Sequence, residues 1–498
     1  MKRKYGINFI LGVSTFLFFM SSCSDWLEVK MEDGIMENTL FSTNEGYMTA
    51  LNGIYTELNN VYGSTLSMGV IDIMAQYYNV ANNNDHTYIN YATYAYSEDN
   101  VESTSASIWS NMYSLIANTN VLLEHCDASD AGITSKYYPI VKGEALALRA
   151  MMHFDLLRLY GPIYNESSAS TLCMPYQETS KKDIQPLLSA RDVLDKVIRD
   201  LESAADLLKE DPIITEGVKD AKASDDGLES YDFSYRQLRL NYYAVKALLA
   251  RAYLWKGDKA TAYKIAKNDI IDKITTADLT VFPWTTKEAV EMTDKEDRIF
   301  SSEVFFSLYN MKRKNLYDSY FDPSITITSR LTFVGSGIAS SDSKVASFYD
   351  DDNDYRKKMW SVETSEEESG VVTALCFNKY KEITGTSTYR YMIPLIRLSE
   401  VYLIAAECTD DLDEALGYIN ELRLHRNCAN TSATVETIQD VITKEFAREM
   451  IGEGQLFFYY KRHAMEQIIS GVKSSEKYDM LLSDYVWPLP KIEQDERY

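Results

Sequence analysis

The side chains that usually carry catalysis or bind metals occur in this chain without the spacing that those tasks require. None of its five histidines pairs with another at a metal-ligand spacing. Asp350, Asp352 and Asp354 alternate as in a calcium-binding loop. Tyr355 and Ser361, however, stand where that loop needs glycine and glutamate, so an acidic surface turn is the better interpretation. We therefore predict no catalytic residue, no metal site and no cofactor.

Tyrosine is the side chain whose abundance points to a function. The chain has 37 tyrosines against 18 phenylalanines and 6 tryptophans. A tyrosine ring combines an apolar face with a hydroxyl group, which suits a partly wet binding surface. Sugar rings present C–H faces and a rim of hydroxyls, so aromatic rings flanked by Asn, Asp, Gln or Arg can hold them. This composition favours the binding of a saccharide.

Two parts of the chain combine aromatic rings with such polar side chains. They are residues 72–94 and a group in the middle of the sequence that also includes Tyr309 and Tyr320. From them we predict seven ligand-binding residues: Asp72, Tyr77, Tyr78, Asn79, Tyr88, Trp284 and Tyr317. For each of these side chains the alternative is ordinary packing or a solvated loop.

Helices are expected to position these side chains. Apolar residues recur at three- and four-residue spacing in five segments, which we predict to be helices: 44–60, 107–126, 139–160, 189–209 and 235–256. Residues 249–262 and 398–423 carry the small, aromatic and turn residues of tetratricopeptide-like helix pairs. Two irregular stretches, 77–106 and 275–390, lie between the helices, and long loops of this kind often carry function.

The N-terminus has the pattern of an exported lipoprotein. Lys2, Arg3 and Lys4 precede an apolar run that is too short for a membrane span, and small residues then lead to Cys23. We predict that residues 1–22 are a signal peptide and that Cys23 is lipidated. A plain secretory signal with an unmodified Cys23 is the alternative.

The net charge disfavours one class of partner, and the remaining cysteines bear on how the chain is stabilised. Loss of residues 1–22 removes three basic and no acidic residues, so the net charge changes from −24 to −27. Such a surface repels phosphate backbones, which disfavours nucleic acid as a partner. Five scattered internal cysteines do not form a disulfide scaffold, and we expect them to be buried as small apolar side chains.

Several motifs occur in an order that carries a family resemblance. Residues 23–27 read CSDWL, residues 144–161 read EALALRAMMHFDLLRLYG, and residues 487–490 read WPLP. Between them lie ALLARAYLW at 247–255 and IRLSEVYLIAAE at 396–407. As an ordered set, these motifs resemble the SusD/RagB family of outer-membrane nutrient-binding lipoproteins, over essentially the whole chain after Cys23.

The resemblance implies a mainly α fold, in which tetratricopeptide-like helix pairs pack against an irregular, loop-rich region with short β hairpins. It implies one domain over residues 23–498, with a helical scaffold at about 40–270 and 390–470 and ligand-binding loops at about 72–106 and 275–390. Glu144, Arg149 and Arg158 lie in its most recognisable motif, and we expect them to be buried ion-pair or capping partners.

The resemblance also implies a function. A lipid-anchored protein of the outer membrane, exposed at the cell surface, would bind an oligosaccharide and pass it to a SusC-like TonB-dependent transporter without altering it. A peptide-binding, RagB-like lipoprotein of the same fold is the first alternative. A glycan-degrading enzyme is the second, less favoured alternative, because it would need an inward-facing pair of carboxylates.

Overall fold

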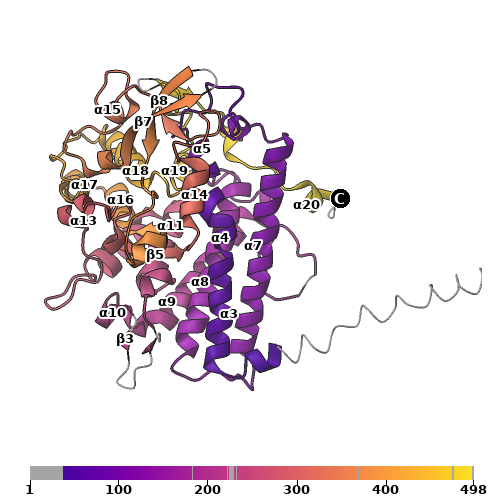
Figure 1. Ribbon diagram of the computed structural model, residues 1–498. Coiled ribbons are helices and arrows are strands. Elements are labelled where there is room, and N and C mark those ends of the chain that lie inside the picture. The colour runs from indigo at the N-terminus through magenta and orange to yellow at the C-terminus, as the bar shows by residue number, and fades with distance from the viewer. Residues whose placement is uncertain are drawn as a thin grey trace, which may run out of the picture.

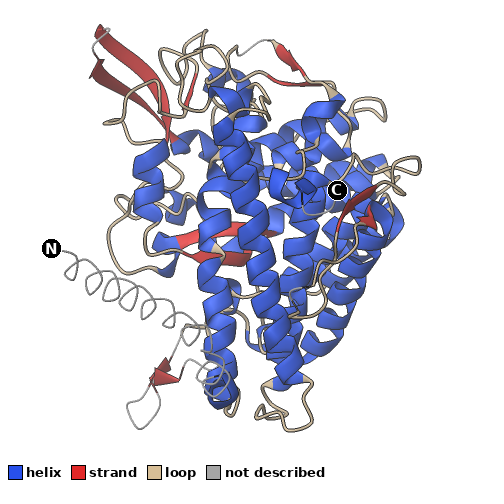
Figure 2. Ribbon diagram, turned by 90° about the vertical axis from the view of Figure 1, so that its right-hand side faces the viewer, coloured by secondary structure: helices blue, strands red, loops and turns tan. Residues whose placement is uncertain are grey.

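The computed structural model of the chain is mainly helical, with few short strands (Figures 1 and 2), which confirms the predicted fold class. It describes residues 37–495 except 182, 221, 224–228, 231–232, 368–369 and 474–475. The predicted signal peptide and the lipidation site at Cys23 lie outside the described residues. No helix in the described ranges combines the length and the apolar character that a membrane crossing requires.

Long helices form one side of the molecule, where α3, α7 and α8 lie side by side (Figure 1). The long helices are α3 (Asn44–Glu57), α7 (Asp99–Cys126), α8 (Tyr138–Tyr160), α9 (Ala190–Leu207) and α11 (Tyr242–Lys256). They confirm the five predicted helices. The last one begins seven residues later than predicted, because residues 236–238 form a separate 3-10 turn and the Asn241 side chain caps the helix by accepting from the Ala244 N–H.

Helix α8 is buried on all sides, and its charged residues are paired inside the protein. Arg149 Nε lies 2.7 Å from Asp200 Oδ2. Arg158 pairs with Asp155, and Glu144 pairs with Arg236. The interpretation of Glu144, Arg149 and Arg158 as buried ion-pair partners is thus confirmed.

Both predicted helix pairs are present. Helix α11 ends at Gly257, whose φ of +86° suits glycine, and the Asp258 side chain caps α12 (Lys259–Lys264). The second pair consists of α16 (Leu398–Cys408) and α17 (Leu412–Leu424), and Asp411 caps its second helix. Helices α18 (Ile438–Met450) and α19 (Leu456–Arg462) follow it. The shorter helices are α4 (Asn59–Val61), α5 (Val70–Met74), α6 (Ile89–Ala92), α10 (Ile213–Glu216), α13 (Lys287–Glu291), α14 (Arg313–Tyr320), α15 (Lys344–Phe348) and α20 (Lys491–Asp495).

The strands form small antiparallel sheets beside the helices (Figure 2). Strand β5 (Val304–Tyr309) pairs with β9 (Met392–Arg397), and β8 (Gly370–Phe377) lies between β6 (Thr332–Phe333) and β7 (Trp360–Glu367). The remaining hairpins are β1 (Leu172–Met174) with β2 (Leu188–Ser189), β3 (Lys222–Ala223) with β4 (Glu229–Ser230), and β10 (Gln467–Ile469) with β11 (Lys477–Asp479).

A buried ion-pair cluster joins α18 to the loop-rich region. Arg356 Nη2 lies 2.7 Å from Asp354 Oδ2, so the last aspartate of the acidic turn at residues 350–354 is a buried ion-pair partner. The cluster continues through side chains that are almost fully buried: Glu303, Lys379, Arg397, Arg426, Glu445, Glu449 and Glu453. The five internal cysteines are buried, as predicted, and all five are free thiols.

Candidate functional site

Four of the seven predicted ligand-binding side chains lie in the core. Asp72, Tyr77, Tyr78 and Tyr317 retain at most 3% of their surface. A side chain without exposed surface does not contact a ligand from outside, so these four predictions are wrong.

Each of these side chains has a structural partner. The carboxylate of Asp72 accepts hydrogen bonds from the backbone N–H groups of Gly452 and Gly454, while burial raises its pKa well above the ordinary value. The Tyr77 hydroxyl donates to the Ala447 carbonyl at 2.7 Å.

The two other buried tyrosines also pack within the core. The ring of Tyr78 lies 5.8 Å from that of Phe321. The Tyr317 hydroxyl donates to Asn378 Oδ1 at 3.0 Å. The polar and aromatic mixture of residues 72–78 therefore reflects packing between α5 and the C-terminal helices.

Trp284 packs against the second helix pair. Its ring stacks on His425 at 4.8 Å with an interplanar angle of 12°, and it meets the edge of Tyr402 at 5.0 Å. These contacts fix the ring beside α16 and the end of α17. Trp284 therefore also has a packing role, in its case against α16 and the end of α17.

The early loop and the mid-chain loop do meet. The backbone N–H groups of Asn79 and Thr87 donate to the carbonyls of Thr332 and Thr328, both at 2.8 Å. The half-buried ring of Tyr88 lies 5.6 Å from Tyr320. We call the surface here the loop face; its residues are Asn79, Asn82, Asn83, Asn84, Asp85, Thr87, Tyr88, Thr326, Thr328 and Ser329. It offers one partly exposed ring among amide and hydroxyl groups.

A cavity of about 470 Å³ lies at the end of β5. We call it the Tyr309 cleft; its lining residues are Asn52, Tyr55, Thr56, Tyr235, Leu238, Arg239, Leu308, Tyr309, Thr386 and Thr388. Tyr309 is 41% exposed, and its ring meets that of Tyr391 edge to face at 5.3 Å. Tyr391 fixes the position of the Tyr309 ring, and part of the ring remains exposed. Such a ring can pack against the apolar face of a ligand.

Polar groups surround this platform. The guanidinium of Arg239 lies 4.7 Å from the centre of the Tyr55 ring, and it donates a hydrogen bond to Asn52. Its Nη1 is buried and lies 3.9 Å from Glu144 Oε2, so this end of the guanidinium faces the interior. With the hydroxyls of Thr56, Thr386 and Thr388, the cleft can donate to and accept from the hydroxyl rim of a sugar.

Sequence reasoning named Tyr309 among the mid-chain aromatics but missed the cleft. Its walls come from residues 52–56, 235–239, 308–309 and 386–388, which no local pattern connects.

His153 is a buried histidine with a packing role. Nδ1 of His153 lies 2.9 Å from the Arg149 carbonyl oxygen, and Nε2 accepts from the Gln177 N–H at 3.0 Å, so both ring nitrogens are occupied. Burial lowers the pKa of His153 to about 3. Its ring stacks on Tyr176 at 3.8 Å. Among the described residues, no group of three His, Cys, Asp or Glu side chains is placed to hold a metal ion.

Comparison with known families gives the class of protein. Residues 234–492 match the model described as the SusD family, and residues 25–254 match a model described as "Starch-binding associating with outer membrane". The first match covers more than half of the chain, so the chain belongs to the SusD family, as its motifs indicated.

The individual relatives share low sequence identity with this chain. SusD-like protein P38 of Formosa agariphila is 27% identical over 205 residues, which is 41% of this chain and 37% of that relative's length. A SusD superfamily protein of Bacteroides thetaiotaomicron superimposes with a TM-score of 0.70 at 22% identity, over 91% of this chain and 98% of that one. A putative sugar binding protein of Bacteroides vulgatus gives 0.65 at 24% identity, over 91% and 96%. At these identities, the solved structures establish the fold.

Proposed function

We propose that this protein binds an oligosaccharide at the cell surface and passes it to a SusC-like TonB-dependent transporter without chemical change. The Tyr309 cleft carries the saccharide part of the proposal, because it joins an exposed ring to the hydroxyl groups of three threonines. Membership of the SusD family supports the rest, together with the starch-binding description of the model over residues 25–254.

In this proposal the ring of Tyr309 packs against the C–H face of one sugar unit. The hydroxyls of Thr56, Thr386 and Thr388 then hold its hydroxyl groups. The loop face, with Asn79 and Tyr88, contacts further sugar units of the chain. A shallow site of this kind gains few stacking contacts, so its affinity is modest.

A lipid on Cys23 completes the proposal. Acyl chains there would anchor the protein to the outer membrane, and residues 23–498 would form one domain. A binder that passes its ligand to a transporter has to stay beside that transporter, which an anchor ensures.

Glycan-array binding followed by calorimetry tests the function. The protein is made from Ser24 onward, so that every described residue is kept. Tyr309→Ala should weaken glycan binding about tenfold, because a stacked ring contributes about 1 kcal/mol beyond its buried area. Tyr88→Ala is the comparison that separates the Tyr309 cleft from the loop face.

Three outcomes would contradict parts of the proposal. Unchanged affinity in both variants would remove both sites from the proposal. Peptides that co-purify, with no glycan retained, would favour the RagB-like alternative. Shortening of a bound glycan over time would favour the enzyme.

A further inference from the structure

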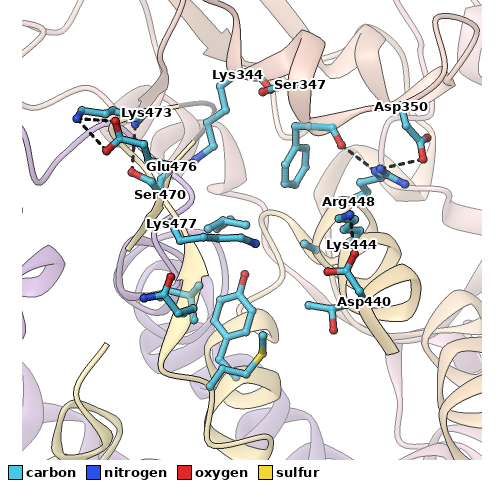
Figure 3. A pocket seen from close by; sticks show the side chains of 18 residues that line it. Lys344, Ser347, Asp350, Asp440, Lys444, Arg448, Ser470, Lys473, Glu476 and Lys477 are labelled. Carbon is cyan, nitrogen blue, oxygen red and sulfur yellow. Dashed lines mark hydrogen bonds and ion pairs between the residues drawn. The ribbon is translucent and has the colours of Figure 1, made fainter. Parts of the chain in front are cut away.

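A second cavity, of about 350 Å³, lies between α15, α18 and the β10–β11 hairpin (Figure 3). We call it the lysine pocket. Five basic and three acidic side chains line it: Lys344, Lys444, Arg448, Lys473, Lys477, Asp350, Asp440 and Glu476. In Figure 3, Lys477 lies on the hairpin side of this space, and Lys444 and Arg448 lie on the α18 side. A positive excess is unusual on a chain whose net charge is −24.

Three of the basic side chains are neutralised by acidic neighbours. Arg448 Nη2 lies 3.0 Å from Asp350 Oδ2, and Lys444 Nζ lies 2.6 Å from Asp440 Oδ2. Lys473 Nζ lies 2.8 Å from Glu476 Oε2. These pairs use all three acids of the lining, so the positive excess belongs to the remaining two lysines.

Lys344 is the first of these two. It is 3% exposed, and its ammonium donates to the backbone carbonyls of Gln76, Tyr77 and Ser470, with no carboxylate partner among the described residues. Burial lowers its pKa to about 7. A pKa of about 7 leaves the amine only partly protonated at neutral pH, and its protons point at carbonyls, so Lys344 adds a fractional positive charge to this wall and no free donor.

Lys477 is the second. It is exposed on β11 and forms no ion pair with any residue that the structure describes. Its ammonium therefore remains available to a ligand.

The rest of the lining is apolar. Phe348, Met465, Ile468 and Ile469 contribute to it alongside the ring of Tyr460. The volume lies at the lower end of the range for small-molecule sites. A matching ligand is small, has one negative group and has an apolar face.

We infer that the lysine pocket binds an anionic sugar unit, whose carboxylate or sulfate ester accepts a hydrogen bond from Lys477 and whose ring packs on the apolar wall. This inference rests on the proposed function, since it takes the ligand to be a saccharide. It adds a charged class of glycan and a site separate from the Tyr309 cleft.

Titration calorimetry with three oligosaccharides of equal length tests the inference: one with uronic acid units, one with sulfate esters and one neutral. We expect at least one anionic oligosaccharide to bind about tenfold more tightly than the neutral one. Lys477→Met should remove that tenfold advantage and leave neutral binding unchanged, because only the anionic group loses a charged hydrogen-bond donor. Lys477→Arg should retain it.

Lys209→Met is the matched control, since Lys209 is also exposed but lies in the turn after α9. It should bind all three oligosaccharides as the parent protein does. The tighter of the two anionic ligands identifies carboxylate or sulfate as the group recognised.

The outcomes separate this inference from the proposed function. Neutral binding that depends on Tyr309, with no anionic advantage, overturns the inference and leaves the proposed function standing. No binding of any saccharide overturns both. Binding of a peptide carboxylate that Lys477→Met abolishes, with no anionic sugar bound, overturns the assignment of the pocket to a sugar.

Discussion

Arg426 and Glu449 form an ion pair with 2.6 Å between Nη2 and Oε1, and neither side chain has exposed surface. Glu449 also accepts from Arg356 at 2.9 Å and from Arg397 at 2.8 Å. One carboxylate on α18 thus gathers arginines from the 3-10 turn before β7, from the end of β9 and from the segment after α17. This ion-pair cluster holds the loop-rich region against the helices.

Replacement of Glu449 by glutamine should strongly destabilise the fold. The substitution keeps the shape but leaves buried arginines short of one negative charge, which costs about 3–5 kcal/mol in other proteins. Urea unfolding measures the change. Glu421→Gln is the control, because the Glu421 side chain is 45% exposed and pairs with His425 near the surface, so its loss should cost less than about 1 kcal/mol. Equal losses in the two variants would contradict a structural role for the cluster.

The same cluster should make the protein sensitive to acid. Burial alone would raise the pKa of Glu449, but Arg426, Arg397 and Arg356 hold that pKa well below its ordinary value, and the pKa of Glu445 is lowered in the same way. A folded-state pKa below the unfolded value of about 4.3 gives stability that is present above that pH and is lost as the pH falls toward the folded-state pKa.

Unfolding free energies between pH 7 and pH 3 measure this loss. Burial raises the pKa of Asp297 to about 6, so protonation of Asp297 stabilises the fold as the pH falls. The pH dependence of the parent protein therefore combines this gain with the loss from the ion-pair cluster. Glu449→Gln should flatten the acid side of the curve. An unchanged slope in that variant would place the acid sensitivity elsewhere.

Tyr77→Ala should destabilise the fold rather than remove a contact with the ligand. Removal of a fully buried ring costs about 3–5 kcal/mol, and the Ala447 carbonyl also loses its donor. Tyr309→Ala should cost less than about 1 kcal/mol, because 41% of that residue's surface is exposed. Thermal melts of the two variants, beside their glycan affinities, separate the two roles. A stable Tyr77→Ala variant with lost affinity would restore Tyr77 as a binding residue.

Tyr77 and Tyr309 also show why the fold was predictable and the site was not. Helices such as α8 follow from a repeated apolar spacing, and the charges of Glu144 and Arg149 inside that spacing imply buried partners. No such spacing distinguishes one tyrosine from another. Tyr77 is buried among Tyr78, Phe348 and the Ala447 carbonyl of α18, and Tyr309 is exposed at the end of β5.

The walls of the Tyr309 cleft illustrate the same limit. Asn52 and Arg239 are in contact across 187 positions of sequence, and Thr386 lies far beyond both. The resemblance to a family predicted that an early loop meets a mid-chain loop, and Thr87 does bond to Thr328. Which side chains remain exposed there depends on packing that only the three-dimensional structure shows.

Gly454 should not accept a side chain. Its φ of +68° is a left-handed conformation, and an added Cβ would lie 1.9 Å from the carbonyl oxygen of Leu66. Its N–H also donates to Asp72, so a shift of this backbone would disturb a buried carboxylate. Gly454→Ala should therefore lower the free energy of unfolding by more than about 2 kcal/mol.

Gly257→Ala is the matched control. Its φ of +86° is also left-handed, but an added Cβ would meet nothing within 4 Å. Only the backbone cost of about 1–2 kcal/mol applies there. Urea unfolding of both variants compares the two glycines. A larger loss at Gly454 than at Gly257 measures the close contact with Leu66 and the bond to Asp72, whereas equal losses would show that the segment around Gly454 can move away from η1 (Tyr62–Met68) at little cost.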